Sequence, residues 1–268
     1  MTGRRKRQRS AGHERFVVGV RVDEQGGADV RQRTVLKVTS EAHDHEIAVM
    51  FDRIAARYDF LNRVLSFGTD IGWRRHALVR AGIERGHAVL DVGAGTGDLS
   101  FAAAGRGAHV IAIDLSPGML AVLARRSSAE QRSRIRTLVG NAEALPLPDA
   151  SIDRIVTGFT VRNVGDLGRA LAEFRRVLRP GGRAVILELS HPPHATFAHL
   201  YSFYFDRVAP AVAALLGGDR EAYRYLPRSL RPFPDAARLA EMLRDAGFIR
   251  VAYERLTFGI AAIHVAEV

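Results

Sequence analysis

The sequence predicts an α/β fold in which a mostly parallel β-sheet is covered by helices on both faces. Short apolar segments typical of buried strands alternate with helical segments from about residue 87 onward. A glycine-rich turn follows the first of these strands. Polar residues suited to ligand binding then follow the later strands, at the edge where open α/β sheets bind their ligands.

The elements are expected in a regular order along the chain. Residues 45–85 should be helical, with a break around residues 66–68. Strands are then predicted at residues 87–92, 109–114, 136–139, 152–157 and 183–189. Helices are predicted at residues 98–105, from Ser116-Pro117 onward, at 167–178 (ended by Pro180-Gly181-Gly182) and at 235–246. Two terminal strands, 248–258 and 260–268, should meet at Gly259.

The alternation is interrupted at residues 191–232. This segment is rich in aromatic residues, and we expect it to form helices packed over one end of the sheet. We assign it to a folded domain spanning residues 41–268 as a helical insertion on the substrate side. Residues 1–40 are polar, without a sustained period, and we expect them to form a disordered basic arm.

Composition excludes several classes of protein. The 268 residues contain no cysteine, which excludes disulfides, thiolate metal sites and cysteine nucleophiles. No apolar run reaches the 18 or so residues of a membrane span, and no apolar segment of a secretory signal follows the basic start. We therefore expect a cytoplasmic protein.

The net charge of +10 raises the question of nucleic-acid binding. Residues 1–40 carry ten basic and four acidic residues, so the rest of the chain is only mildly basic. The arm could bind anionic lipid or nucleic acid. Alternatively, it has no binding role and is a solubilising tail or an upstream extension from a misassigned start codon. We favour the second interpretation, and no nucleic-acid partner is expected.

The turn after the first strand has the pattern D-x-G-x-G-x-G, formed by Asp91, Gly93, Gly95 and Gly97. A dinucleotide fingerprint would need a glycine at position 98, which is Asp98. No phosphate-binding G-x-x-x-x-G-K-[ST] loop is present. The pattern resembles motif I of class I methyltransferases, which use S-adenosylmethionine. That resemblance implies a Rossmann-like, seven-stranded, mostly parallel sheet with helices on both faces.

Polar and small residues after the strands suit the parts of this cofactor. Asp91 is placed for a water or the methionine ammonium, and Thr96 for the carboxylate. Asp114, at the tip of the second strand, suits the two ribose hydroxyls. An adenine edge is expected at Asn141, through its side chain, or at Ala142, through its backbone. Gly158 is expected beneath the methionine moiety.

Longer segments resemble the ubiquinone/menaquinone biosynthesis C-methyltransferase family. They are YDFLNRVLSFGTDIGW (residues 58–73), FTVRNVGD (159–166), RVLRPGGRAVILELS (176–190), YRYLPRSLRPFPD (223–235) and LTFGIAAIHV (256–265). Asp70 stands where the family has histidine, Leu61 where it usually has methionine, and Gly158 and Thr160 where it has serine and glycine. The basic arm has no counterpart in the family.

The resemblance implies methyl transfer from S-adenosylmethionine to a ring carbon of a prenylated quinol. We expect demethylmenaquinol as acceptor, with the methoxy-benzoquinol of the ubiquinone pathway or another aromatic or lipid metabolite as alternatives. A nucleic-acid methyltransferase or a non-catalytic binding protein is disfavoured. A prenylated acceptor implies that the enzyme works at the membrane surface, so peripheral contact with the inner face of the membrane is one expectation. A homodimer is a further possibility that the sequence does not decide.

A phenol ionises near pKa 10, so the site must help to form the nucleophilic phenolate. We assign phenolate stabilisation and ring orientation to Arg162 and Asn163, with a water or carboxylate as proton acceptor. No metal is expected. Further candidates are a cofactor contact at Tyr58 and substrate contacts at Asp59, Asn62, Tyr225, Arg231 and His264. Each of these has an alternative in local packing, ion pairing or the core.

Overall fold

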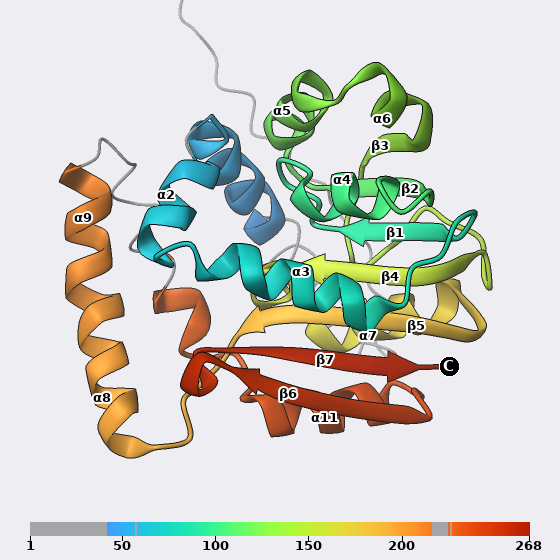
Figure 1. Cartoon of the computed structure of the whole chain (residues 1–268). Helices are drawn as coiled ribbons and strands as arrows, with labels where there is room; N and C mark the ends of the chain where they lie inside the picture. Colours follow the sequence, from blue (N-terminus) through green and yellow to red (C-terminus); the bar gives the residue numbers. More distant parts are fainter. Residues whose placement is uncertain (1–41, 57, 216–224, 226) are drawn as a thin grey trace, which may run out of the picture. The chain divides into compact units, whose positions relative to one another are not determined.

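The computed structural model describes residues 42–56, 58–215, 225 and 227–268 (Figure 1). The predicted arm, residues 1–40, lies outside the described residues. Within the described part, no helix is long and apolar enough to cross a membrane.

A seven-stranded sheet forms the centre of the described domain, with strand order β3-β2-β1-β4-β5-β7-β6. Neighbouring strands pair in parallel from β3 to β5, whereas β7 runs antiparallel to both β5 and β6. The strands are β1 (Ala88–Val92), β2 (His109–Asp114), β3 (Ile135–Val139), β4 (Ile152–Gly158), β5 (Leu178–Leu189), β6 (Arg250–Leu256) and β7 (Ala261–Glu267). The predicted seven-stranded, mostly parallel α/β fold is confirmed.

Helices cover both faces of this sheet (Figure 1). Side chains alternate along each strand, so Val89 packs on one face and Leu90 on the other. The first face is covered by α3 (Thr69–Ala81), α4 (Asp98–Ala104) and α5 (Pro117–Arg126). The second is covered by α7 (Leu167–Val177) and α11 (Ala236–Asp245). Both faces are therefore buried, which explains the short, continuously apolar strands.

The structure differs from the predicted boundaries where local signals compete. Helix α7 ends at Val177, and β5 already begins at Leu178, so Pro180-Gly181-Gly182 lies inside the strand. The register of β4 and β5 shifts between Ile152 and Arg154, which accommodates these residues at the strand start. A short helix, α6 (Ala129–Arg134), also precedes β3; the capping box formed by Ser128 and Gln131 stabilises its start.

The predicted helical segment before β1 consists of a helix at residues 42–54, α2 (Tyr58–Leu65) and α3. Gly68, in the left-handed conformation, separates α2 from α3 close to the predicted break. In the predicted insertion, α8 (Ala195–Phe203), a π-helical turn (Tyr204–Val208) and α9 (Ala209–Leu215) follow one another directly. We call these three consecutive elements the α8–α9 rod. The Tyr204 hydroxyl donates a hydrogen bond to the Leu65 carbonyl at 2.7 Å, which connects the rod to α2. Residues 216–224 and 226 of the insertion lie outside the described residues.

Candidate active site

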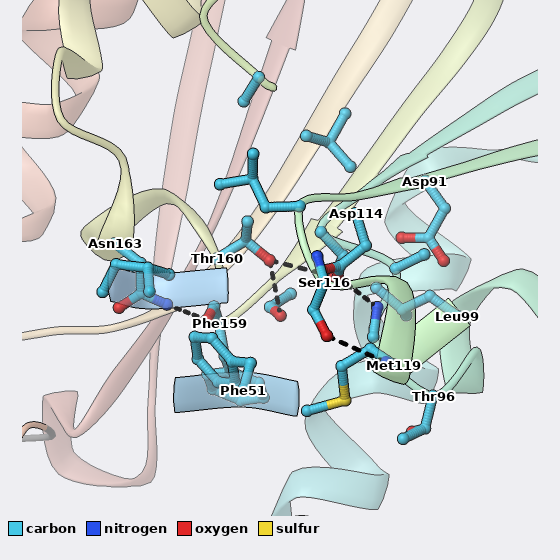
Figure 2. A pocket seen from close by; sticks show the side chains of 18 of the residues that line it. Phe51, Asp91, Thr96, Leu99, Asp114, Ser116, Met119, Phe159, Thr160 and Asn163 are labelled. Carbon is cyan, nitrogen blue, oxygen red and sulfur yellow. Dashed lines mark hydrogen bonds between the residues drawn. The ribbon is translucent and has the colours of Figure 1, made fainter. Parts of the chain in front are cut away.

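A cavity opens at the carboxyl ends of β1, β2 and β4 (Figure 2). Figure 2 shows Asp91, Leu99 and Met119 on one side of it and Phe159 and Asn163 on the other. The structure thereby brings together most of the residues predicted to hold the cofactor. Those lining it are Tyr58, Asp91, Gly93, Gly95, Thr96, Asp114, Asn141, Ala142 and Gly158.

Gly97 is the predicted cofactor residue that does not line this cavity. It has φ of 99°, and a Cβ there would lie 2.7 Å from the Cγ of Leu123. The glycine is therefore required where α4 packs against α5, and its role is in the turn itself.

Asp91, at the end of β1, is fully buried. One carboxylate oxygen, Oδ2, accepts a hydrogen bond from the Ser100 hydroxyl at 2.6 Å. The other, Oδ1, is buried without a partner. Burial raises the pKa of Asp91 to about 7, and the hydrogen bond from Ser100 only partly offsets this. An unpaired carboxylate oxygen in a cavity wall fits a cationic ligand group such as an ammonium.

Asp114 ends β2 and organises the glycine loop. Its Oδ2 accepts from the Gly95 amide and its Oδ1 from the Ser116 amide, both at 2.8 Å. Burial raises the pKa of Asp114, against these two backbone hydrogen bonds. The carboxylate lines the cavity with its second lone pairs still available, as ribose recognition requires.

Gly93 lies directly against Thr160 from the loop after β4. With φ of 66°, a Cβ at residue 93 would lie 2.1 Å from the Thr160 Cγ2 atom. The Thr160 hydroxyl lies 3.3 Å from the carbonyl oxygens of both Gly93 and Gly158. The threonine that replaces the family's glycine is therefore accommodated by a glycine on the facing loop.

The helix at residues 42–54 forms part of the cavity wall, which Ile47, Ala48 and Phe51 line. Asp52 accepts from the Ser116 hydroxyl at 2.5 Å and from the Gly118 amide at 2.8 Å, which ties this helix to the start of α5. The side-chain amide of Asn141 donates to Asp44 at 2.6 Å. The predicted adenine contact of Asn141 therefore has a protein partner on its donor side, whereas buried Ala142 keeps a place in the wall.

A second cavity of about 470 Å³, within the usual range for small-molecule sites, lies beside the first. Its lining is mainly apolar and aromatic and comes from α2, α3, the turns after β4 and β6, and the α8–α9 rod. The two cavities share Tyr58, Arg74 and Phe159 as lining residues. The Arg74 guanidinium lies 5.0 Å from the centre of the Phe159 ring. Ligands in the two cavities would therefore meet across this three-residue wall.

The wall of the second cavity contains a buried ion pair. The Arg162 Nη1 atom donates to Glu188 Oε1 at 2.6 Å and to the Phe159 carbonyl at 2.7 Å. Burial lowers the pKa of Arg162, but the adjacent Glu188 outweighs it and holds the pKa above its ordinary value. The Arg162 Nε and the Tyr201 hydroxyl are both buried without partners, and both residues line this cavity. Burial also raises the pKa of Tyr201, so it stays a neutral donor.

The two residues predicted to be catalytic face different cavities. Arg162 lines the apolar cavity, whereas Asn163 lines the one beside the glycine loop. The Asn163 side-chain amide lies 3.4 Å from the Phe159 carbonyl, and its Oδ1 is buried without a partner. Tyr58 is in the shared wall and within hydrogen-bonding reach of Asn62; burial raises its pKa. The pair Arg162–Asn163 thus spans the boundary between the two cavities.

Of the predicted substrate residues, only Asn62 lines the apolar cavity. The other four have different places in the structure. Asp59 accepts from the Thr96 hydroxyl at 2.6 Å and pairs with Arg126 at 2.8 Å. Half-buried Tyr225 packs against the 42–54 helix, and exposed Arg231 pairs with Asp206 at 3.1 Å.

His264 lies in the core, in the middle of β7. Its Nε2 is 2.8 Å from the Ala236 carbonyl, and its ring stacks on Tyr253 at 5.5 Å. Burial lowers its pKa to about 4, so the ring is neutral near pH 7. The structure does not bring His264 to either cavity.

Sequence reasoning missed Glu188, Arg74 and Phe159 as site residues. Glu188 carried a usable signal, since it is the acidic residue in the apolar strand segment VILEL, and a buried acid needs a partner. The other two carried none, because only the folded chain places α3 and the β4 loop around one cavity. In the described part of the chain, no group of three or more His, Asp or Glu residues is arranged to hold a metal ion.

The fold and this site define a class I methyltransferase that uses S-adenosylmethionine. The profile of the ubiE/COQ5 methyltransferase family matches residues 39–267, and the chain belongs to this family. It is 46% identical over 220 residues to a demethylmenaquinone methyltransferase of Thermus thermophilus, covering 81% of this chain and 99% of the relative.

A second relative is the ubiquinone/menaquinone biosynthesis C-methyltransferase UbiE of Methylobacterium nodulans. It is 42% identical over 220 residues, covering 80% of this chain and 87% of the relative. A solved SAM-dependent methyltransferase from Thermotoga maritima has the same fold, with a TM-score of 0.60 and 18% identity over 82% of this chain and 98% of that one. The predicted family is confirmed.

Proposed function

We propose that this chain transfers a methyl group from S-adenosylmethionine to a ring carbon of demethylmenaquinol. The observation that carries the proposal is the pair of cavities that meet at Tyr58, Arg74 and Phe159. One contains the glycine loop, buried Asp91 and partly buried Asp114, and the other is apolar with a few polar groups. Relatives at 45–46% identity named demethylmenaquinone methyltransferase support this choice of acceptor.

The cofactor cavity fits S-adenosylmethionine. The unpartnered Asp91 Oδ1 suits the methionine ammonium, Asp114 suits the ribose hydroxyls, and buried Ala142 lies where the adenine would pack. Gly93 and Gly95, both with positive φ, let the backbone approach the ligand. When bound, S-adenosylmethionine supplies a methyl group activated by its sulfonium.

The apolar cavity suits a quinol ring with a prenyl tail. Aromatic walls favour the ring and exclude water. The two unpartnered donors, the Arg162 Nε–H and the Tyr201 hydroxyl, can each donate a hydrogen bond to a ring oxygen. The donor at Arg162 stabilises the phenolate form of the adjacent oxygen. Glu188 holds the guanidinium in place and acts as a positioning residue.

The residues then promote an in-line displacement. Ionisation of the ring hydroxyl, whose proton passes to a water or a nearby carboxylate, pushes electron density onto the neighbouring ring carbon. That carbon forms the new carbon–carbon bond to the methyl group as the methyl–sulfur bond breaks, and S-adenosylhomocysteine is the leaving group. The methylated carbon then loses its own proton to water, and the ring becomes aromatic again. Tyr58, Arg74 and Phe159 border both cavities and therefore fix the distance between carbon and methyl group.

Because the acceptor is a prenylated lipid, we also propose that the enzyme works at the membrane surface. The methoxy-benzoquinol of the ubiquinone pathway and another aromatic or lipid metabolite are the other candidate acceptors. Asp70 gives weight to another metabolite, because this residue lines the apolar cavity at a position where the resembled family has histidine.

The proposal is tested with purified protein, S-adenosylmethionine and short-chain forms of both quinols under reducing conditions. Mass spectrometry should detect the methylated menaquinol, and Arg162→Ala should lose at least about a hundredfold in turnover. Cofactor affinity should survive in that variant, since Arg162 does not line the cofactor cavity. Methylation of the benzoquinol alone would replace the acceptor, and unchanged turnover in Arg162→Ala would refute its assigned role.

A further inference from the structure

Large apolar side chains are exposed around the opening of the apolar cavity. Phe67 is 81% exposed, Phe258 76%, Leu200 64% and Phe203 53%. Phe67 and Leu200 also line the cavity, whereas Phe203 and Phe258 do not. We call these four residues the mouth patch. Side chains this exposed contribute little to the stability of the folded chain.

Ring contacts place Phe67 and Phe258 beside residues that line the cavity. The Phe67 ring lies 6.0 Å from that of Tyr204, and the Phe258 ring lies 5.3 Å from that of Phe197. Tyr204 and Phe197 both line the cavity. The turn between α2 and α3 therefore presents Phe67 beside the π-helical turn that follows α8, and the turn between β6 and β7 presents Phe258 beside α8 itself.

Two of these residues are also held in an unfavourable backbone conformation. Phe67 has φ of 52° and Phe258 has φ of 58°, in the left-handed region where glycine or asparagine is cheaper. Each turn therefore combines backbone strain with an exposed, bulky ring. Burial within the described chain does not offset the strain of either turn, so a partner that covers the rings would account for both the strain and the exposure.

We propose that the mouth patch docks on the surface of a lipid bilayer and inserts its phenylalanine rings among the headgroups. This inference rests on the proposed function, because a prenylated quinol in the bilayer needs an opening at the membrane. One cation lies against a ring of the patch: the Arg207 guanidinium is 5.7 Å from the Phe203 ring centre. A second, exposed Arg255, lies near the turn of Phe258, with its guanidinium 5.1 Å from the Tyr253 ring centre. Asp206 is nearby, paired with Arg231.

The positive charge and the apolar rings together favour a lipid bilayer as the partner of the mouth patch. Isolated aromatic rings flanked by arginine suit the headgroup region, where rings anchor and cations attract anionic lipids.

The test measures sedimentation of the full-length protein with vesicles of equal parts phosphatidylcholine and phosphatidylglycerol. The variant Phe203→Ser with Phe258→Asn should partition at least about tenfold more weakly than the original chain. Asparagine tolerates the left-handed conformation, so the variant should keep its melting temperature. The matched control is Ile249→Asn, which removes a 73% exposed side chain at the opposite end of β6. It should partition like the original chain.

Methyl transfer to a short-chain quinol in solution separates the two proposals. The double variant should keep this activity within about twofold, because neither residue lines a cavity, but should lose activity on long-chain quinol in vesicles. If soluble quinol is not methylated by the original chain, the proposed function fails, while vesicle partition still reports on the patch. Equal partition of all three proteins overturns the docking proposal. So does a change in oligomeric mass, which would identify the patch as an interface between copies.

Discussion

At the scale of single residues, the most informative group is Asp91. It is buried with one oxygen unpartnered, and burial raises its pKa to about 7. Between the ordinary carboxyl pKa of 3.8 and about 7, the folded chain binds a proton that the unfolded chain does not. Stability without cofactor therefore falls as the pH rises through this window, by about 4 kcal/mol at most.

We expect Asp91→Asn to raise the melting temperature of the cofactor-free protein by several degrees at pH 8, because the uncompensated buried charge is removed. The same change should abolish detectable binding of S-adenosylmethionine. In the original chain, affinity should be constant above pH 7 and fall about tenfold per pH unit below it, as the ammonium loses its carboxylate. Calorimetry at several pH values measures both effects. Exposed Asp149→Asn is the control, and an unchanged affinity in Asp91→Asn would exclude the ammonium assignment.

The Arg162–Glu188 pair gives a second prediction at this scale. Removing one member leaves a buried charge, so Arg162→Met should cost about 3–5 kcal/mol of stability. Adding Glu188→Gln removes that charge and keeps one acceptor oxygen, enough for the Leu189 amide that bonds Glu188 Oε1 at 2.8 Å; the longer bond of 3.3 Å from the Arg162 amide to Oε2 is lost. The double variant should recover most of the lost stability without recovering turnover. Chemical denaturation measures the cycle, and additive losses would show that the two charges do not interact.

At the scale of elements, the site depends on two loops that must fit each other. A Cβ at Gly93 would overlap the Thr160 side chain and lie 2.6 Å from its Cβ, and residue 93 also has positive φ. We expect Gly93→Ala to cost about 2–4 kcal/mol from overpacking and backbone strain together. Thr160→Gly in the same chain should restore all but the strain of about 1–2 kcal/mol, whereas Thr160→Ala should not. Denaturation midpoints of the three variants measure this coupling; equal rescue by alanine would contradict it.

The same scale explains what the sequence could and could not predict. The glycine loop was predictable because its constraints are local: a sharp turn after β1 and an acid at the tip of β2 are visible as spacing. The contacts of Asp44 and Asp52 were not, because they join the 42–54 helix to loops roughly 60–100 residues later in the chain. His264 shows the opposite error. The sequence already placed it in the middle of a strand, away from the strand end where ligands bind, and this position argued against a substrate contact.

At the scale of the whole molecule, the strands position both cavities at one edge of the sheet, and the helices added around them set the chemistry. The parallel order from β3 to β5 brings the predicted cofactor residues together at one cavity, as alternating strands and helices predict. The apolar cavity depends on the α8–α9 rod packing beside α2 and α3. Its acceptor could therefore be inferred from family resemblance, but not from spacing.

The last prediction concerns the domain boundary. The family match begins at residue 39, and residues 40–268 form one compact unit. We expect a chain of residues 40–268 to keep its melting temperature and its turnover with a short-chain quinol, because both cavities and the mouth patch lie within it. It should also bind phosphatidylcholine vesicles like the full chain, while any extra binding to anionic vesicles by the full chain should disappear as salt is raised. Loss of cofactor binding on truncation would contradict this boundary.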